Sequence, residues 1–237
     1  RSSAVFWRNG SSLLIQGARV LGRAKRRWIS ERKRDIYHLK AKELGYRSMA
    51  AFKLIEICRR TGLIGPGDVV VDLGAAPGGW LQVALERVGS SGRVLGVDLR
   101  PIEPLSTSNA STIIGDIEDP ELAKMILASL AGRADVVLSD ASPNLTGIWE
   151  LDQARQLSLA SSSVRIASEV LRPGGAVILK AFQGSLFDDL LSTIRRSFRD
   201  VDLVRPGATR KRSSEIYLIC RGYLPRGAPS RVTSSSG

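Results

Sequence analysis

The stretch from Val69 to Trp80 constrains the fold most, because it reads as a buried strand, a turn of small residues and the start of a helix. Residues 69–73 are β-branched or apolar around Asp72, and the turn Gly-Ala-Ala-Pro-Gly-Gly lets the backbone pass close to a ligand. In α/β folds such turns lie at the carboxyl edge of the sheet, where nucleotides bind. The G-x-G-x-x-G spacing of dinucleotide-binding folds is absent. Asp98 ends the next predicted strand at the spacing of a ribose-binding carboxylate, so the block predicts an adenosine-binding site.

Positive charge is concentrated at one end of the chain. The formal net charge is +12, and residues 1–60 hold 16 Lys or Arg against 4 Asp or Glu, whereas residues 61–237 hold 19 of each. A one-ended basic segment is the pattern expected of a protein that binds a polyanion. The alternative is a solvated basic tail that aids solubility. A hydrophobic content of 43% indicates a globular protein and argues against the disordered and membrane classes.

The cysteine and histidine content argues against a disulfide framework and against a metal site. Cys58 and Cys220 lie far apart in apolar surroundings, and His38 is the single histidine in a charged helical segment. We therefore expect a reducing, cytoplasmic location and no bound metal. The apolar stretch 12–21 is too short and too interrupted to span a membrane, so no membrane partner is expected.

Strands and helices alternate through most of the chain, which predicts a parallel sheet covered by helices on both faces. Two strands at the end, with only a loop between them, predict one antiparallel strand. The expected fold is the mixed seven-stranded sheet of Rossmann-like methyltransferases, in the α/β class. The predicted strands are 68–73, 93–98, 111–115, 134–140, 176–182, 200–205 and 214–221, and the predicted helices are 49–61, 79–88, one beginning at 119–121, 152–171 and 185–198.

The chain divides into four predicted segments. Residues 1–24 show no strong pattern, and residues 25–62 form a basic helical segment packed on the domain. Residues 63–222 form the catalytic domain, and the Ser-rich residues 223–237 are expected to be disordered. In the basic segment Ser48 is the expected N-cap of the helix at 49–61. Lys53 lies off the apolar stripe of that helix, which by itself indicates a surface lysine.

Charged residues fall at the predicted carboxyl ends of the strands. Lys180 follows Ala-Val-Ile-Leu, so its stem is expected to be buried, and a buried lysine needs a partner. Asp140, at the end of the neighbouring strand, is the expected partner. Glu215 begins the last strand, where it is either a solvated strand start or a further carboxylate of the cleft. The strand-end residues are Asp72, Asp98, Asp116, Asp140 and Lys180.

These motifs together resemble the FtsJ (RrmJ-like) family of ribosomal-RNA large-subunit 2′-O-ribose methyltransferases. The resemblance runs from about Arg34 to Gly222. Two departures are that Met49 stands where the family has an arginine, and that residues 140–144 read Asp-Ala-Ser-Pro-Asn, as in archaeal members. The motifs are Gly45-Tyr46-Arg47-Ser48 with Ala50–Leu54, Val71–Trp80, Ser139-Asp140 with Ser142-Pro143-Asn144, Lys180–Gly184, and Ser213-Ser214-Glu215.

The resemblance implies S-adenosylmethionine as the cofactor and a catalytic tetrad of Lys53, Asp140, Lys180 and Glu215. It thereby turns Lys53 from an expected surface residue into a site residue. Gly78 and Trp80 would meet the methionine end of the cofactor, Asp98 the ribose hydroxyls and Asp116 the adenine edge. The full set of expected cofactor-binding residues is Asp72, Gly74, Pro77, Gly78, Gly79, Trp80, Asp98, Asp116 and Asp140.

The reaction implied by the resemblance is methyl transfer to a ribose 2′-hydroxyl, expected on a uridine of 23S-type rRNA in a large ribosomal subunit or a pre-ribosomal particle. A tRNA 2′-O-methyltransferase of the same family and a catalytically silent ribosome-assembly factor stay open as alternatives. No obligate protein partner is expected. Basic residues would contact phosphates and thereby position the RNA. They are Arg32, Lys33, Arg34, Arg47, Arg210, Lys211 and Arg212.

Overall fold

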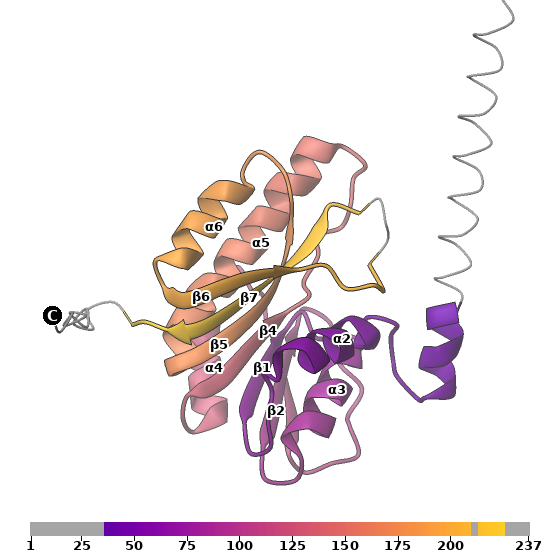
Figure 1. Cartoon of the computed structure of the whole chain (residues 1–237). Coiled ribbons are helices and arrows are strands. Elements are labelled where there is room, and N and C mark those ends of the chain that lie inside the picture. The colour runs from indigo at the N-terminus through magenta and orange to yellow at the C-terminus, as the bar shows by residue number, and fades with distance from the viewer. Residues whose placement is uncertain (1–35, 210–212, 226–237) are drawn as a thin grey trace, which may run out of the picture.

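The computed structural model describes residues 36–209 and 213–225, and these build a seven-stranded sheet in the order β3-β2-β1-β4-β5-β7-β6 (Figure 1). β7 runs antiparallel to both of its neighbours, and the other pairs are parallel. The predicted fold class, with one antiparallel strand, is therefore confirmed. The strands are β1 (Val69–Leu73), β2 (Arg93–Asp98), β3 (Ala110–Ile114), β4 (Ala134–Ser139), β5 (Leu171–Phe182), β6 (Phe198–Val204) and β7 (Glu215–Tyr223).

Helices cover both faces of the sheet, because its strands carry apolar residues on both sides. One core joins α2 and α3 to alternate strand residues such as Val70, Leu138 and Ile178. The other core joins α4, α5 and α6 to the strand residues that point to the opposite face of the sheet, such as Val71 and Leu179. The helices are α2 (Ala51–Thr61), α3 (Gly79–Val88), α4 (Leu122–Leu130), α5 (Trp149–Val170) and α6 (Phe187–Arg195).

The basic segment is in part a structural element of the domain. Residues 36–43 are helical, and α2 follows them. Ala51, Leu54, Ile57 and Cys58 of α2 are buried, so this helix packs firmly against the sheet. The predicted apolar stripe is confirmed for Leu54, Ile57 and Cys58, with Ala51 buried in place of the predicted Ala50. Residues 1–35, with the expectations for the first segment, lie outside the described residues, as does the predicted tail from residue 226 onward.

Among the predicted boundaries that differ from the structure, three have a clear physical reason. Ser48 is not the N-cap of α2: that position is Ala50, without a side-chain cap, and the Ser48 carbonyl accepts a bond from the Ala51 N–H (3.2 Å). β5 begins at Leu171, which pairs with Ala134, and residues 172–175 form a bulge before pairing resumes at Ala176. The predicted turn there is thus an interruption within a strand.

The third difference is the end of α6, which stops at Arg195, although the sequence predicts a helix to residue 198. Phe198 is buried and begins β6, where its ring packs against Tyr223 at a centroid distance of 5.5 Å. The burial of the Phe198 side chain outweighs the helical pattern that the sequence shows up to residue 198. In the part of the chain that the structure describes, no helix has the length and apolar character needed to cross a membrane.

Candidate active site

The residues predicted at the strand ends meet at the carboxyl edge of the sheet, on the face covered by α2 and α3. Side chains alternate between the two faces along a strand. Asp72 therefore shares a face with Val70, Asp140 with Leu138, and Lys180 with Ile178, and all three apolar residues belong to the core beneath α2 and α3. The same alternation puts Glu215 and Tyr217 of β7 on this face, because Ile219 belongs to that core.

Lys180 is held as a fully hydrogen-bonded ammonium group. Its side chain is 5% exposed, and its Nζ lies 3.1 Å from Asp140 Oδ1 and 2.5 Å from the Asp140 carbonyl oxygen. The third acceptor is the Ser142 hydroxyl. An ammonium has three N–H donors, and three acceptors surround this one. The predicted partnership of Lys180 with Asp140 is confirmed.

Tyr217 joins the two carboxylates of the site. Its hydroxyl donates to Asp140 Oδ1 (2.7 Å) and lies 3.1 Å from Glu215 Oε1. The ring is fully buried and packs against Trp80 at a centroid distance of 5.9 Å. Burial and the adjacent negative charges of Asp140 and Glu215 raise the pKa of the Tyr217 hydroxyl well above its usual range. The hydroxyl therefore keeps its proton and serves as a fixed donor.

Lys53 of α2 forms an ion pair with Glu215. Its Nζ lies 2.6 Å from Glu215 Oε1, and the two side chains are only 13% and 14% exposed. The same carboxylate oxygen accepts a bond from the Thr209 hydroxyl (3.2 Å). Lys53 is thus a buried partner of a residue on β7 and not a surface lysine. Lys53, Asp140, Lys180 and Glu215, which we call the four-residue cluster, form one connected network through Tyr217.

The charges of the cluster determine the ionisation of Asp140. Burial alone would raise the pKa of this carboxyl. The ammonium groups of Lys180 and Lys53, together with the hydrogen bond from Tyr217, outweigh that effect and hold the pKa of Asp140 below its usual range. Asp140 is therefore a carboxylate at neutral pH, with negative charge placed between two positive groups.

Asp72 is the exception at this edge, since neither of its carboxylate oxygens has a hydrogen-bond partner among the residues that the structure describes. The residue is fully buried. Burial, followed by repulsion from Asp140 and Asp98, raises the pKa of its carboxyl well above the usual value. A buried acceptor without a donor is costly unless a ligand supplies one, which marks Asp72 as a position for a ligand donor or cation.

The turn after β1 leaves little room for side chains. Gly74 has φ of +77°, and a Cβ there would lie 2.8 Å from the Ala141 Cβ. Gly78 has φ of +110°, and a Cβ there would lie 2.9 Å from Arg47. Gly79 begins α3, where a Cβ would lie 2.2 Å from the Ser48 hydroxyl oxygen. These glycines let the backbone run close to the strand ends, as a small-residue ligand cradle requires.

The other residues of the predicted cofactor set lie around this turn. Asp98 accepts bonds from the Ala76 N–H (2.9 Å) and the Arg100 N–H (3.0 Å), so its carboxylate is held at the end of β2. The exposed Asp116 follows β3, and the Gly115 N–H donates to the Asp98 carbonyl (3.0 Å), which keeps the two strand ends together. Pro77 is exposed, whereas Trp80 is buried and donates from its ring N–H to the Ala50 carbonyl (2.9 Å).

Arg47 makes contacts that the sequence did not predict. Its guanidinium donates to the carbonyl oxygens of Pro77 (3.3 Å), Glu103 (2.6 Å) and Pro104 (2.8 Å). It therefore ties the segment before α2 to the turn after β1 and to the loop after β2. The other predicted RNA-binding residues, Arg32, Lys33, Arg34, Arg210, Lys211 and Arg212, lie outside the described residues.

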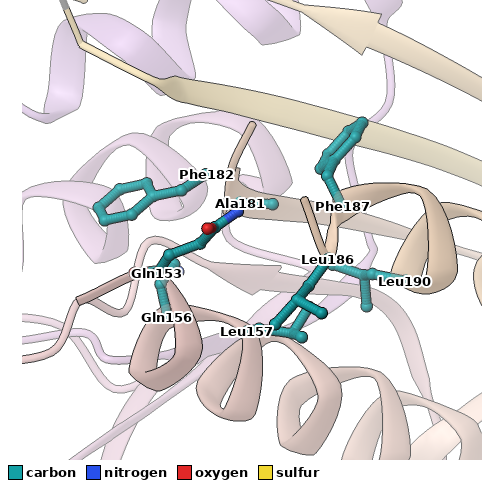
Figure 2. A pocket seen from close by; sticks show the side chains of 8 residues that line it. All are labelled: Gln153, Gln156, Leu157, Ala181, Phe182, Leu186, Phe187 and Leu190. Atoms are coloured by element: carbon teal, nitrogen blue, oxygen red, sulfur yellow. The ribbon is translucent and has the colours of Figure 1, made fainter. Parts of the chain in front are cut away.

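A small pocket lies behind the end of β5, on the side of α5 (Figure 2). Gln156, one of its lining residues, is buried and donates through Nε2 to the carbonyl oxygens of Ala141 (3.2 Å) and Lys180 (3.3 Å). This side chain fixes the backbone at the ends of β4 and β5. It therefore supports the position of Lys180 from the opposite face of the sheet.

Sequence reasoning missed four residues of the site, namely Ser142, Gln156, Thr209 and Tyr217. The alternation of residues along the last strand carried a signal for Tyr217, because it places this residue on the same face as Glu215. Gln156 lies within a long helix with many polar residues, and nothing in its spacing distinguishes it from its neighbours.

Comparison with known proteins assigns the chain to a family. The FtsJ-like methyltransferase family model matches residues 46–223. Relatives named ribosomal RNA large subunit methyltransferase E are similar over most of both chains. The protein from Methanothrix thermoacetophila is 50% identical over 84% of this chain and 75% of its own length, and the one from Acidiphilium cryptum is 44% identical over 92% and 95%.

Solved structures agree with the fold. A protein from Plasmodium falciparum, assigned as a candidate ribosomal RNA methyltransferase, superimposes with a TM-score of 0.68 and 27% sequence identity over 76% of this chain and 100% of its own. The pre-rRNA processing protein fibrillarin from Methanococcus jannaschii shares the fold, with a TM-score of 0.51 and 15% identity over 68% of this chain and 69% of its own. Because the family model spans β1 to β7 and includes the whole four-residue cluster, the chain belongs to the FtsJ-like methyltransferase family.

Proposed function

We propose that this protein methylates the 2′-hydroxyl of a ribose, expected to be a uridine, in large-subunit ribosomal RNA, with S-adenosylmethionine as the methyl donor. The names of its relatives support the rRNA substrate class. The observation that carries the proposal is the buried four-residue cluster at the carboxyl edge of the sheet, with Lys180 held between Asp140 and Ser142. The strongly basic residues 25–62 support a polyanionic substrate.

The residues present fit the proposed cofactor. Asp72 offers two buried carboxylate oxygens without a donor, which suits the positively charged donor molecule. Gly74 and Gly78 keep the turn after β1 clear of side chains, and Asp98 lies at the end of β2, where a ribose is bound in folds of this kind. When bound, S-adenosylmethionine supplies an electrophilic methyl group on a sulfonium. Pro77, Gly79, Trp80, Asp116 and Asp140 complete the proposed binding set.

The reaction transfers one methyl group and releases one proton. Methyl transfer would form a bond from the ribose oxygen to the methyl carbon as the bond from that carbon to sulfur breaks, and the hydroxyl proton would pass to water. We propose that the Lys180 ammonium exchanges its contact with the Ser142 hydroxyl for one with the 2′-oxygen, and thereby orients that oxygen and stabilises the negative charge that develops on it. Asp140 and Tyr217 hold the Lys180 ammonium in position, directly and through the shared carboxylate. A neutral Lys180 would instead accept that proton at Nζ.

Lys53 of α2 and Glu215 of β7 form an ion pair within the four-residue cluster. Their contact leaves further N–H donors of Lys53 free to approach a phosphate or hydroxyl of the substrate. Because α2 belongs to the basic segment, the proposed RNA-binding surface runs directly into the cluster. Arg32, Lys33, Arg34, Arg210, Lys211 and Arg212 are proposed as phosphate contacts from the sequence, and the proposed cellular location is the cytoplasm.

The proposal is tested by methyl transfer from radiolabelled S-adenosylmethionine to large subunits, rRNA and tRNA prepared from a strain that lacks the enzyme. Label at a ribose 2′-oxygen of large-subunit rRNA is the expected result. Label confined to tRNA would contradict the proposed rRNA substrate but would still support the proposed 2′-O-methyl transfer. No label in any RNA, with the cofactor bound, would point to a catalytically silent assembly factor.

A matched pair of lysine variants makes this experiment specific. Lys180→Ala is expected to reduce transfer to near background while cofactor affinity stays within a few-fold of the wild type. Lys124→Ala removes a lysine whose side chain is 74% exposed on α4, so its transfer rate is expected to equal that of the wild type. Near-normal transfer by the Lys180 variant would contradict the assigned role.

A further inference from the structure

Phe182 extends the surface of the four-residue cluster by one aromatic ring. In the antiparallel pair of β5 and β7, Lys180 lies opposite Tyr217 and Phe182 lies opposite Glu215. Directly opposed residues point to the same face, with their Cβ atoms about 5 Å apart. Phe182 and Lys180 are two residues apart on one strand, which puts their Cα atoms about 6.6 Å apart. Phe182 therefore lies beside the cluster at the edge of the sheet, where its side chain also lines the small pocket next to α5.

A second aromatic residue covers this ring and is itself open to solvent. Trp149 stacks on Phe182 with a centroid distance of 6.3 Å and an interplanar angle of 17°. Figure 2 shows the Phe182 ring pointing away from the side chains of Leu186, Phe187 and Leu190. Trp149 is 44% exposed, and the loop before it carries Leu145 and Ile148, which are 67% and 58% exposed. Exposed apolar groups gathered at one place mark an interaction site.

The occupant that fits this place is a nucleobase. A ribose can reach a lysine as enclosed as Lys180 only if its nucleotide leaves the helical stack, and the base then needs a new surface on which to pack. Aromatic side chains supply such a surface, because every base has a π-face. Gln183 directly follows Phe182, and its N–H donates to the carbonyl of Ser214 (2.9 Å). Ser214 comes two positions after the basic residues 210–212 in the sequence.

We propose that Phe182 and Trp149 form a base-stacking subsite for the nucleotide whose ribose is methylated, or for its direct neighbour in the strand. This inference rests on the proposed RNA 2′-O-methyl transfer. The subsite recognises an unstacked base through its face, so it contributes affinity and positioning to any of the four bases. The choice of target nucleotide must then come from other contacts.

Photochemical crosslinking tests the contact directly. The full chain is bound to large subunits from the strain lacking the enzyme and irradiated at short ultraviolet wavelength, and tryptic peptides carrying a nucleotide are identified by mass. Adducts are expected on peptides 134–155 and 181–195, which contain Trp149 and Phe182 respectively. Adducts confined to other peptides, or crosslinks from these two to ribosomal proteins alone, would overturn the subsite.

Variants of Phe182 separate stacking from structural support. Phe182→Leu keeps an apolar side chain but removes the aromatic face, and Phe182→Tyr retains it. The leucine variant is expected to bind large subunits about tenfold more weakly than the wild type and to show a KM for RNA raised by a similar factor. The tyrosine variant is expected to stay within about twofold, with the affinity for S-adenosylmethionine unchanged in both. Met125→Ala, which alters a 45% exposed residue on α4, is the matched control.

The outcomes separate this inference from the proposed function. Equal binding by the leucine and tyrosine variants overturns the subsite, even when the wild type methylates the RNA. Adducts on both peptides, together with weaker binding by the leucine variant, support the subsite even when no methyl group is transferred. In that case only the proposed catalytic function fails.

Discussion

The ion pair between Lys53 and Glu215 links α2 to β7 across 162 positions of the chain, so its strength is a test of how the site is assembled. We consider Lys53→Met, which keeps most of the apolar stem, and Glu215→Gln, which keeps the shape of the side chain. Each variant alone removes one charge and leaves its partner within a cleft that is largely closed to water. The double variant removes both charges together.

The structure sets the size of the expected coupling. Fully exposed pairs contribute about 0.2–1 kcal/mol, whereas hydrogen bonds to charged groups contribute about 1.5–3 kcal/mol. This pair has an N–O distance of 2.6 Å and side chains only 13% and 14% exposed, so it belongs near the second range. When Lys53 is removed, Glu215 keeps the Thr209 hydroxyl as a donor, which moderates the loss. We expect a coupling free energy of about 2 kcal/mol.

Urea unfolding of the wild type, the two single variants and the double variant gives this coupling as a double-mutant cycle. The exposed pair of Lys124 and Glu121 on the surface provides the control cycle, for which we expect about 0.3–0.5 kcal/mol. A coupling between Lys53 and Glu215 no larger than that of the control would refute the argument. It would mean that water screens the pair and that α2 is held at the site by apolar packing alone.

Three further predictions concern the cofactor side of the site. The pKa of Asp72 is raised, so its contribution to stability is complete below about pH 4 and is lost as the pH rises through the pKa of the folded protein. Asp72→Asn cannot ionise, so its Tm should match or exceed that of the cofactor-free wild type at pH 8. The difference in Tm should shrink toward pH 4. A lower Tm of the variant at pH 8 would contradict this reasoning. Asp98→Ala should weaken binding of S-adenosylmethionine by about 1–3 kcal/mol in titration calorimetry, and an unchanged affinity would remove Asp98 from the binding set. Arg47→Ala should lower cofactor affinity, because three carbonyl contacts are lost, and leave the salt dependence of RNA binding unchanged. A salt slope reduced by about one, with normal cofactor affinity, would instead support a phosphate contact by Arg47.

Local patterns predicted the sheet because β1, β2, β4 and β5 contain apolar runs with a charged residue at or beside the carboxyl end. They also predicted the pairing of Lys180 with Asp140, since the two residues end neighbouring strands. By contrast, Lys53 looked like a surface lysine, because the partner that encloses it lies on β7. Its place in the cluster was expected only from the family resemblance.

The remaining differences have the same physical origin. Ser48 has the chemistry of an N-cap, but in the structure its hydroxyl lies at the start of α3 beside Gly79. Arg47 is predicted to bind phosphate, and its guanidinium also donates to carbonyl oxygens of two loops that the sequence does not show to be adjacent. Tertiary contacts of this kind are not visible in spacing.

The position of β7 in the sheet has a consequence for the folding of the newly synthesised chain. This strand inserts between β5 and β6, so β6 has no partner in the sheet until residues 215–223 have emerged from the ribosome. During that interval β5 presents an unpaired edge, which is a template for aggregation. Glu215 and Tyr217 arrive with the same strand, so the nascent chain completes its sheet and its reactive cluster in one late event. A chain truncated before Glu215 would thus be both inactive and prone to aggregate.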